Sequence, residues 1–196
     1  MIGIVNYGAG NIFSLTAALK RQGIAYGMIN VPADFDKFSK IIIPGVGHAG
    51  SAMAKLQASG LVEHIKALTK PVLGICVGMQ LLTDFSEEGN AKLVGIIPLK
   101  TLHFEDRIKD KVPHMGWNTI DFENNCPLFK DIPNNSYFYF VHSYFIEYDA
   151  HYTVANCQYG LSFSAAIAKH NFWGVQFHPE KSGKAGEQLL LNFSKI

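Results

Sequence analysis

The feature that most constrains the fold of this chain is a cysteine between two glycines, Gly74-Ile75-Cys76-Val77-Gly78. An apolar run of strand type leads into this pentapeptide, and apolar residues at helical spacing follow it. A strand that turns sharply into a helix needs glycines beside the turn, because side chains there would crowd the backbone. The spacing is that of the G-x-S-x-G nucleophile elbow, with sulfur in place of oxygen. The pentapeptide predicts a reactive cysteine on a strained strand-to-helix turn, and a buried structural cysteine stays open as the alternative.

Strand and helix patterns alternate over the first 85 residues. We expect strands at 2–7, 24–31, 40–43 and 71–75, with helices at about 12–22, 51–68 and 76–85. Such alternation is typical of a parallel sheet with right-handed crossovers. From about residue 93 the strand patterns become shorter and turn-separated, at 137–145, 152–157, 162–168 and 173–177, and a helix follows at about 184–193. The sequence predicts one α/β domain over residues 1–196, an open mixed, mainly parallel sheet flanked by helices with an antiparallel β addition.

Composition excludes several classes of partner. The formal net charge is +1, which gives no electrostatic basis for binding nucleic acid or an anionic membrane. The longest apolar runs are well short of the roughly 20 residues that a membrane-spanning helix needs. The N-terminal residues have the pattern of a strand rather than of a signal peptide. Three cysteines far apart do not form a disulfide framework, so we expect a reducing, cytoplasmic location.

Two weaker patterns do not support a cofactor or a metal. Gly8 and Gly10 follow the first strand as in a dinucleotide fingerprint, but Phe13 stands where a third glycine belongs. The second strand ends near Asn30 rather than at a carboxylate. The eight histidines and three cysteines show no paired ligand spacing. We therefore expect neither a bound cofactor nor a metal ion.

A second group with chemical potential is His178-Pro179-Glu180. In an extended chain, residues two apart point the same way, so the imidazole and the carboxylate share a face. The carboxylate can accept one ring N–H and fix the tautomer, which leaves the other nitrogen free to act on the Cys76 thiol. Taken alone, this tripeptide also fits a solvated turn. The two pieces together predict a nucleophile, a base and an orienting carboxylate at the carboxyl ends of strands.

A thiolate that attacks a carbonyl also needs donors for the oxyanion. The backbone amide of Val77 directly follows the nucleophile and is one candidate. A second amide is expected from the loop that ends the third strand, at Val46 or Gly47, where glycine lets the backbone approach a ligand closely. An ordinary strand-exit turn is the alternative for this loop.

The segments 74–80 and 178–180 resemble the class I, or triad, glutamine amidotransferases, which have a flavodoxin-like fold. Further stretches are similar to one branch, the glutaminase subunits of imidazole glycerol phosphate synthases, which serve histidine biosynthesis: residues 6–11 (NYGAGN), 113–118 (PHMGWN), 139–144 (YFVHSY) and 176–182 (QFHPEKS). The similarity runs from residue 2 to the last helix, and the PHMGWN segment is highly specific for this branch.

The resemblance implies a catalytic role for the triad. Cys76 attacks the side-chain amide of glutamine, His178 moves protons, and Glu180 orients His178. A glutamyl thioester forms, ammonia leaves, and water releases glutamate. The resemblance also assigns residues beside the substrate, with Glu88 on its α-ammonium group: Gly45, Gln80, Glu88, His142, Ser143 and Tyr144.

The resemblance further implies a heterodimer. Ammonia passes to a (β/α)8-barrel cyclase subunit, which makes imidazole glycerol phosphate and AICAR. Asn11, Trp117 and Lys181 fall on segments that face this partner, and His114 is expected at the same interface. The isolated subunit is expected to be nearly inactive, because the partner and its ligand switch the loop at residues 45–47. The histidines at 48, 64, 151 and 170 are expected on the surface.

Three departures from the branch pattern keep a rival open. Asn6 replaces an acidic residue, Leu99 replaces a glycine, and His103 replaces an arginine. A paralogous glutaminase that supplies ammonia to another synthase, such as a surface-sugar amidotransferase, would share the same triad. More distant alternatives are a cysteine peptidase or γ-glutamyl hydrolase, and a non-catalytic binding module. Intact Cys76 and His178 argue against the last of these.

Overall fold

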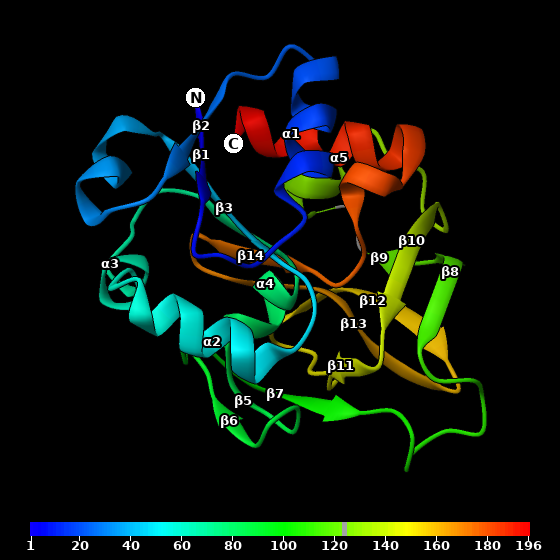
Figure 1. The fold of residues 1–196 in the computed structure, drawn as a ribbon. Helices are drawn as coiled ribbons and strands as arrows, with labels where there is room; N and C mark the ends of the chain where they lie inside the picture. The colour runs from blue at the N-terminus through cyan, green and yellow to red at the C-terminus, as the bar shows by residue number, and fades with distance from the viewer. Residues whose placement is uncertain (123–124) are drawn as a thin grey trace.

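A computed structural model describes residues 1–122 and 125–196 and shows a large mixed sheet with helices on both faces (Figure 1). Its strands are β1 (Ile2–Val5), β2 (Tyr26–Ile29), β3 (Lys40–Gly45), β4 (Val72–Cys76), β5 (Thr83–Ser86), β6 (Ala91–Lys92), β7 (Ile97–His103), β9 (Asp121–Phe122), β11 (Tyr144–Ile146), β12 (Thr153–Tyr159), β13 (Leu161–Lys169) and β14 (Phe172–Val175). The helices are α1 (Ile12–Arg21), α2 (Ala49–Ala58), α3 (Val62–Lys66), α4 (Val77–Leu81) and α5 (Gly183–Lys195), with short 3-10 segments at Pro32–Lys37, Pro127–Phe129 and Pro179–Lys181.

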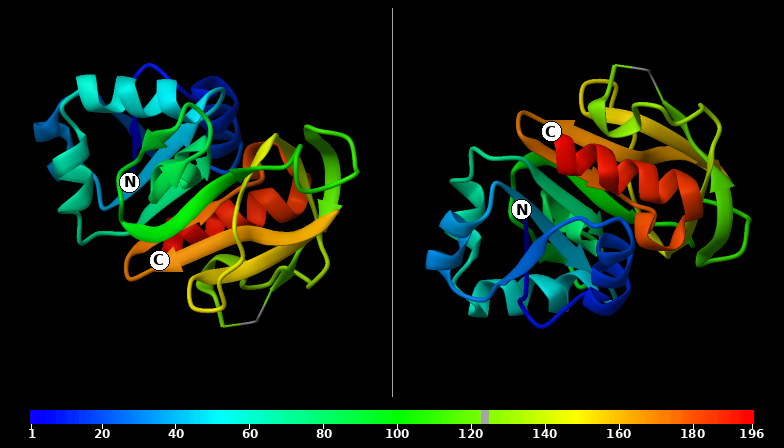
Figure 2. Two further views of the ribbon diagram at one scale, coloured as in Figure 1. Left: turned by 90° about the horizontal axis from the view of Figure 1, so that it is seen from below. Right: turned by 90° about the horizontal axis from the view of Figure 1, so that it is seen from above.

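The parallel part of the sheet has the order β2-β1-β3-β4-β14. Its central strands are apolar at successive positions rather than alternating, because α1 and α5 cover one face and α2, α3 and α4 cover the other (Figures 1 and 2). The carboxyl ends of β3, β4 and β14 therefore lie side by side. This edge is where an open α/β sheet places its ligands.

The remaining strands extend the sheet in a mainly antiparallel manner. β13 pairs antiparallel with β14, β12 and β11, and β7 follows β11. β5 and β6 complete the far edge, and β9 pairs with β12. The predicted mixed, mainly parallel sheet with an antiparallel addition is therefore confirmed.

A separate two-stranded sheet, here called the β8–β10 ribbon, consists of β8 (His114–Thr119) and β10 (Tyr137–His142). Its strands alternate between the two faces, as expected for a half-buried ribbon. One face buries Phe138, Phe140 and the two histidines at the strand ends, and the other exposes Met115, Trp117 and Tyr137. In Figure 1 the ribbon stands at the edge of the main sheet, beside β12 and β13.

Three expected elements were wrong in their extent. The helix expected at 51–68 is two helices, because Gly60 at φ +73° turns the chain between α2 and α3. The helix expected at 76–85 ends at Leu81, and residues 83–86 form β5 instead, with Thr83 and Ser86 buried. The strand expected at 137–145 is interrupted at Ser143, so that β10 belongs to the ribbon and β11 to the main sheet. Within the described residues, no helix is both long enough and apolar enough to cross a membrane.

Candidate active site

Cys76 lies on a strained turn between β4 and α4. Its backbone has φ 54° and ψ −114°, a conformation that a residue with a side chain rarely adopts. A Cβ at Gly74 would lie 2.4 Å from the carbonyl oxygen of Gly78, and a Cβ at Gly78 would meet the carbonyl oxygen of Ile43 at 1.9 Å. Both glycines are therefore needed for the close approach of the backbone. The predicted nucleophile elbow is confirmed as a structure.

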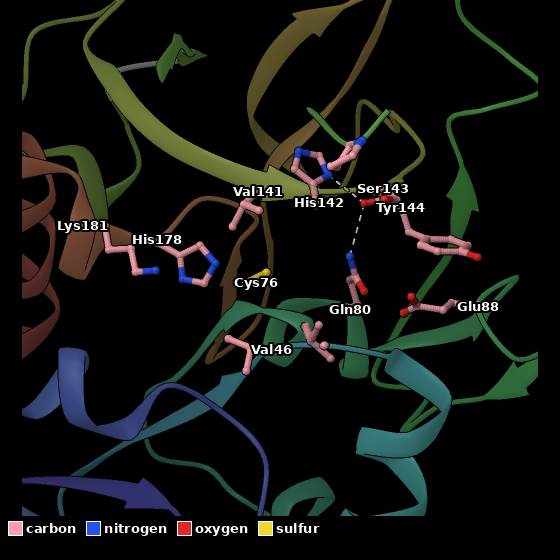
Figure 3. Close-up of a pocket in the computed structure, with 13 residues that line it drawn as sticks. Val46, Cys76, Gln80, Glu88, Val141, His142, Ser143, Tyr144, His178 and Lys181 are labelled. Atoms are coloured by element: carbon pink, nitrogen blue, oxygen red, sulfur yellow. Dashed lines mark hydrogen bonds between the residues drawn. The ribbon is translucent and has the colours of Figure 1, made fainter. Parts of the chain in front are cut away.

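His178 and Glu180 leave the strand next to the elbow. β14 pairs in parallel with β4, and His178 follows it after two residues. Nδ1 of His178 lies 2.8 Å from Oε1 of Glu180, and both side chains are buried. Because the carboxylate accepts the Nδ1 proton, Nε2 is left for the Cys76 thiol. In Figure 3 the His178 ring points toward the Cys76 sulfur.

The charge of His178 follows from these two neighbours. Burial alone would lower the pKa of His178, but hydrogen bonds with Cys76 and Glu180 and the negative charge of both groups raise it to about 10. An imidazolium at neutral pH stabilises a thiolate on the sulfur beside it. The arrangement therefore supplies both a nucleophile and a proton donor.

The loop after β3 reaches the elbow from the other side. Gly45 lies opposite Cys76 in the strand register, and a Cβ there would meet the amide nitrogen of Gly78 at 2.4 Å. The hydroxyl of Tyr7 donates to the carbonyl oxygen of Pro44 at 2.7 Å, which anchors the start of the loop. Burial, reinforced by the negative charge of Cys76, raises the pKa of Tyr7.

A cavity of about 440 Å³ opens in front of the sulfur (Figure 3). Most of the residues expected at the oxyanion and substrate positions line it, together with Cys76 and His178: Val46, Gly47, Val77, Gln80, Glu88, His142, Ser143 and Tyr144. Gly45 does not line this cavity. It borders a separate small hollow behind the triad, with Asn11 and Glu180.

Glu88 has two neighbours that matter for binding. Its Oε2 accepts a hydrogen bond from the Ala49 amide at 2.5 Å, at the start of α2 and two residues after Gly47. Figure 3 shows its carboxylate facing the cavity below the Tyr144 ring. Burial, followed by the charge of Glu88, raises the pKa of Tyr144. Glu88 thus gives the far end of the cavity a negative charge.

Gln176 contacts the nucleophile, and the sequence interpretation gave it no role. Its Nε2 donates to Sγ of Cys76 at 3.7 Å, and its Oε1 accepts from Nε2 of Gln80 at 3.1 Å. Residues 176 and 177 form a bend after β14, and Glu180 lies in the 3-10 turn at Pro179–Lys181, so the alternation of an extended chain does not place Gln176 or Glu180. The spacing argument could not have found Gln176, because its contact with Sγ of Cys76 depends on the pairing of β14 with β4.

The residues expected to face a partner lie at the surface or near it. The Trp117 side chain is 55% exposed, and Lys181 lies with Nζ 5.8 Å from the centre of the Tyr139 ring on the same side of the ribbon. Asn11 is half-buried and caps α1, with Oδ1 accepting from the Ser14 amide at 3.2 Å.

The expectation that His114 lies at the interface was wrong. Its side chain is buried, stacked on Tyr159 with ring centres 4.0 Å apart, and its Nδ1 is 2.9 Å from Nε2 of His142. Successive side chains of β8 point to opposite faces of the ribbon. His114 is therefore on the inner face and Met115 is on the outer face. The four histidines expected on the surface, at 48, 64, 151 and 170, are exposed.

The three departures from the family pattern do not touch the triad. Asn6 donates to the side chain of Asn30 at 2.9 Å, so two amides pair at the ends of β1 and β2. Leu99 is buried in β7. His103 does not line the cavity but packs on the ring of Tyr144, which does, with ring centres 4.5 Å apart. Among residues 1–122 and 125–196, no three His, Cys, Asp or Glu side chains cluster in a way that could hold a metal ion.

Comparison with known proteins agrees with this geometry. The family model for class-I glutamine amidotransferases matches residues 4–195. The chain is 50% identical over 198 residues to imidazole glycerol phosphate synthase subunit HisH of Haemophilus influenzae, covering 98% of this chain and 96% of the relative. It is 47% identical over 196 residues to the subunit of the same name from Buchnera aphidicola, covering 100% and 99%.

Solved structures show the same fold at low sequence identity. A crystal structure described as a glutamine amidotransferase superposes with a TM-score of 0.76 at 13% identity and covers 100% of this chain and 99% of its own. PurLQS from Thermotoga maritima gives a TM-score of 0.71 at 18% identity, covering 98% and 96%.

Proposed function

This chain belongs to the class-I glutamine amidotransferases, among the relatives named HisH, and we propose that Cys76, His178 and Glu180 are the triad with which it hydrolyses glutamine. One observation carries the proposal. A cysteine on a strained elbow at the end of β4 shares a cavity with a histidine from the next strand, and a buried carboxylate holds that histidine at 2.8 Å.

The geometry supports a two-step reaction. The Cys76 thiolate attacks the side-chain carbonyl carbon of glutamine, and the developing oxyanion accepts hydrogen bonds from the Val77 amide and from the loop of Val46 and Gly47. Protonated His178 gives its Nε2 proton to the amide nitrogen, the C–N bond breaks, and ammonia leaves a γ-glutamyl thioester. Neutral His178 then takes a proton from water, the hydroxide attacks the thioester, and glutamate and the Cys76 thiolate are released.

The far end of the cavity fits the amino-acid part of glutamine. The Glu88 carboxylate suits the α-ammonium group, because opposite charges attract strongly in a partly desolvated site. Oε1 of Gln80 is buried without a hydrogen-bond partner among the described residues, so it is an acceptor available to the substrate. Ser143, Tyr144 and the backbone at His142 form the wall beside the side chain of glutamine.

We propose that the ammonia is used by a second subunit, a (β/α)8-barrel cyclase that makes imidazole glycerol phosphate and AICAR. The relatives are named as subunits of imidazole glycerol phosphate synthase, which supports a multi-subunit enzyme. The exposed Trp117 and Lys181 side chains, with Asn11 at the start of α1, are the residues that we propose contact this partner, and their accessibility supports this. The cysteines are free thiols, in keeping with a reducing cytoplasm as the site of this reaction.

One experiment tests both the proposed glutaminase activity and the choice between the cyclase and a different synthase as the partner. Glutamate release is measured with the purified chain alone, and then with a histidine-pathway barrel cyclase and its nucleotide substrate. We expect low turnover alone and strong activation by the loaded cyclase, abolished by Cys76→Ala and retained by Cys157→Ala, which removes a buried thiol outside the cavity. Absence of activation, with Cys76 still alkylated by a glutamine analogue, would assign the glutaminase to a different synthase. Turnover that survives Cys76→Ala would contradict the proposed nucleophile.

A further inference from the structure

Two buried histidines connect the β8–β10 ribbon to the wall of the cavity. His114 and His142 are directly opposite each other in the ribbon register, and Nδ1 of His114 is 2.9 Å from Nε2 of His142. Nδ1 of His142 is 2.7 Å from the carbonyl oxygen of Tyr144. At the outer end, Nδ2 of Asn118 is 3.2 Å from Nε2 of His114.

The connection continues from Tyr144 to the nucleophile. The same carbonyl oxygen accepts a second hydrogen bond, from Nε2 of Gln80 at 3.3 Å, and Figure 3 shows the two bonds meeting there. Gln80 also donates to Gln176, and Gln176 donates to Sγ of Cys76. An unbroken series of hydrogen bonds therefore runs from the ribbon to the sulfur without involving His178.

Only one arrangement of protons satisfies the series. The Tyr144 carbonyl can only accept, so His142 carries its proton on Nδ1 and accepts at Nε2. His114 must then donate from Nδ1 and accept at Nε2 from the Asn118 amide. Asn118 cannot rotate to reverse this order, because its Nδ2 also donates to the Gln158 carbonyl at 3.1 Å and its Oδ1 accepts from the Thr119 amide at 2.8 Å.

We propose that His114 and His142 act as a neutral pair of positioning residues that fix the Tyr144 carbonyl and, through Gln80 and Gln176, the orientation of the Cys76 sulfur. This inference rests on the proposed glutaminase function. The Tyr144 carbonyl accepts one hydrogen bond from His142 and one from Gln80. If His142 no longer holds this carbonyl in place, the side-chain amide of Gln80 loses its fixed acceptor and can turn. Gln176 would then lose the partner that aims its N–H at the sulfur.

Burial and packing keep the pair neutral and in place. His114 is stacked between Tyr159 and Phe140, with ring centres 4.0 and 4.8 Å away. Burial lowers the pKa of His114 to about 4. Burial and the neighbouring His114 lower that of His142 to about 3. His114 does not line the cavity, so an effect of its substitution on chemistry would pass through His142.

Two substitutions at His114 separate positioning from packing. His114→Phe keeps an aromatic ring for the stack but removes the donor, and His114→Asn places an amide nitrogen near the position of Nδ1 but removes the ring. With the cyclase and its ligand, we expect His114→Phe to lower kcat by about tenfold or more with KM for glutamine within about twofold. His114→Asn is expected to melt at a lower temperature yet keep kcat within about threefold of the unmodified chain.

Two further variants complete the test. Phe129→Leu disrupts a buried aromatic stack with Phe122 outside the cavity. It is expected to lower the melting temperature and to leave kcat unchanged. Asn118→Asp puts an acceptor where His114 Nε2 needs a donor, and it is expected to lower kcat although half-buried Asn118 lies outside the cavity. The proposal is overturned if His114→Phe keeps full kcat, or if all four variants lose activity only in proportion to stability.

A second readout does not depend on the proposed function. The rate at which iodoacetamide alkylates Cys76, followed by mass spectrometry of the cysteine peptides, reports the reactivity of the sulfur in the chain without substrate. We expect His114→Phe to change this rate several-fold and His114→Asn to leave it near that of the unmodified chain. A glutaminase assay that fails while this pattern holds would reject the proposed function and keep the positioning pair. Equal rates in both variants would reject the pair.

Discussion

Two buried histidines border the same cavity, and their surroundings drive them to opposite charge states. His178 is held by the Glu180 carboxylate and beside Cys76, and its pKa rises to about 10. His142 is equally buried, but its partners are a second histidine and a carbonyl, and its pKa falls to about 3. Burial favours the neutral form of both rings, so the partner decides which one carries charge. One histidine can therefore move protons while the other holds the backbone in place.

The first prediction concerns Glu180, whose carboxylate helps to raise the pKa of His178 while that of His142 is lowered. In Glu180→Gln the pKa of His178 falls and the tautomer is no longer fixed, so kcat is expected to drop by at least about 100-fold. The measurement is glutamate release with the loaded cyclase, beside an NMR titration of the histidine ring. Glu187→Gln, which alters an exposed ion pair with Arg21, is the control and is expected to keep activity within about twofold. Equal effects of the two substitutions would contradict the comparison.

The second prediction concerns the pH dependence of the free energy of unfolding. Because the folded-state pKa of His178 is raised, its contribution is fully present below about pH 6.5 and is lost as pH rises toward 10. The pKa values of His142 and His114 are lowered, so the unfolded chain binds more protons in acid, and stability falls as pH drops from about 6.5 toward 4 and 3.

Denaturant unfolding at a series of pH values from about 5 to about 9 measures how the free energy of unfolding changes on the acidic side and on the alkaline side. Glu180→Gln is expected to flatten the alkaline side alone, and His114→Phe to reduce the acidic side alone. A single substitution that flattened both sides would show that the two histidines titrate as one unit rather than separately.

The third prediction concerns Tyr7, which anchors the loop that approaches Cys76 from the side of β3. Tyr7→Phe removes the hydrogen bond to the Pro44 carbonyl without changing the ring that fills the core. We expect kcat to fall by about three- to tenfold, with a loss of stability of about 1 kcal/mol from the unpaired carbonyl. Turnover and thermal unfolding are the measurements, and unchanged turnover would mean that this anchor does not set the oxyanion loop.

The smallest effect is expected at a histidine outside both groups. His64 is exposed on α3, with its ring 6.4 Å from that of Phe35. His64→Ala should leave kcat unchanged and alter the free energy of unfolding by no more than about 0.5 kcal/mol. A large loss of turnover here would mean that the histidine effects reflect general destabilisation.

The sequence predicted the His178 side of the cavity well because its determinants are local. Gly74, Cys76 and Gly78 act within one turn, and His178 and Glu180 are only two residues apart, although a 3-10 turn at Pro179–Lys181 joins them instead of the expected extended chain. Parallel pairing of β4 with β14 then brings the two segments together. A pattern with short-range causes can be interpreted without knowing the rest of the fold.

The resemblance placed His142 and Gln80 beside the substrate, but the hydrogen bonds behind them escaped prediction because the residues that form them are distant in sequence. His114 and His142 meet through ribbon pairing across 28 residues, and Gln80 meets Gln176 across 96. The break at Ser143, which divides one apolar run between two sheets, depends on which strands are free to pair. The end of α4 at Leu81 likewise reflects the pairing of β5 with β7, not a helix-breaking residue.

The most direct test of the central claim is to trap the covalent intermediate. The chain, assembled with the cyclase and its ligand, is mixed with isotopically labelled glutamine, quenched in acid, digested and analysed by mass spectrometry. We expect a labelled γ-glutamyl group on the peptide that contains Cys76, absent in Cys76→Ala and strongly reduced in Glu180→Gln. Labelled glutamate released without any adduct on Cys76, or an adduct on Cys126 or Cys157 instead, would contradict the central claim.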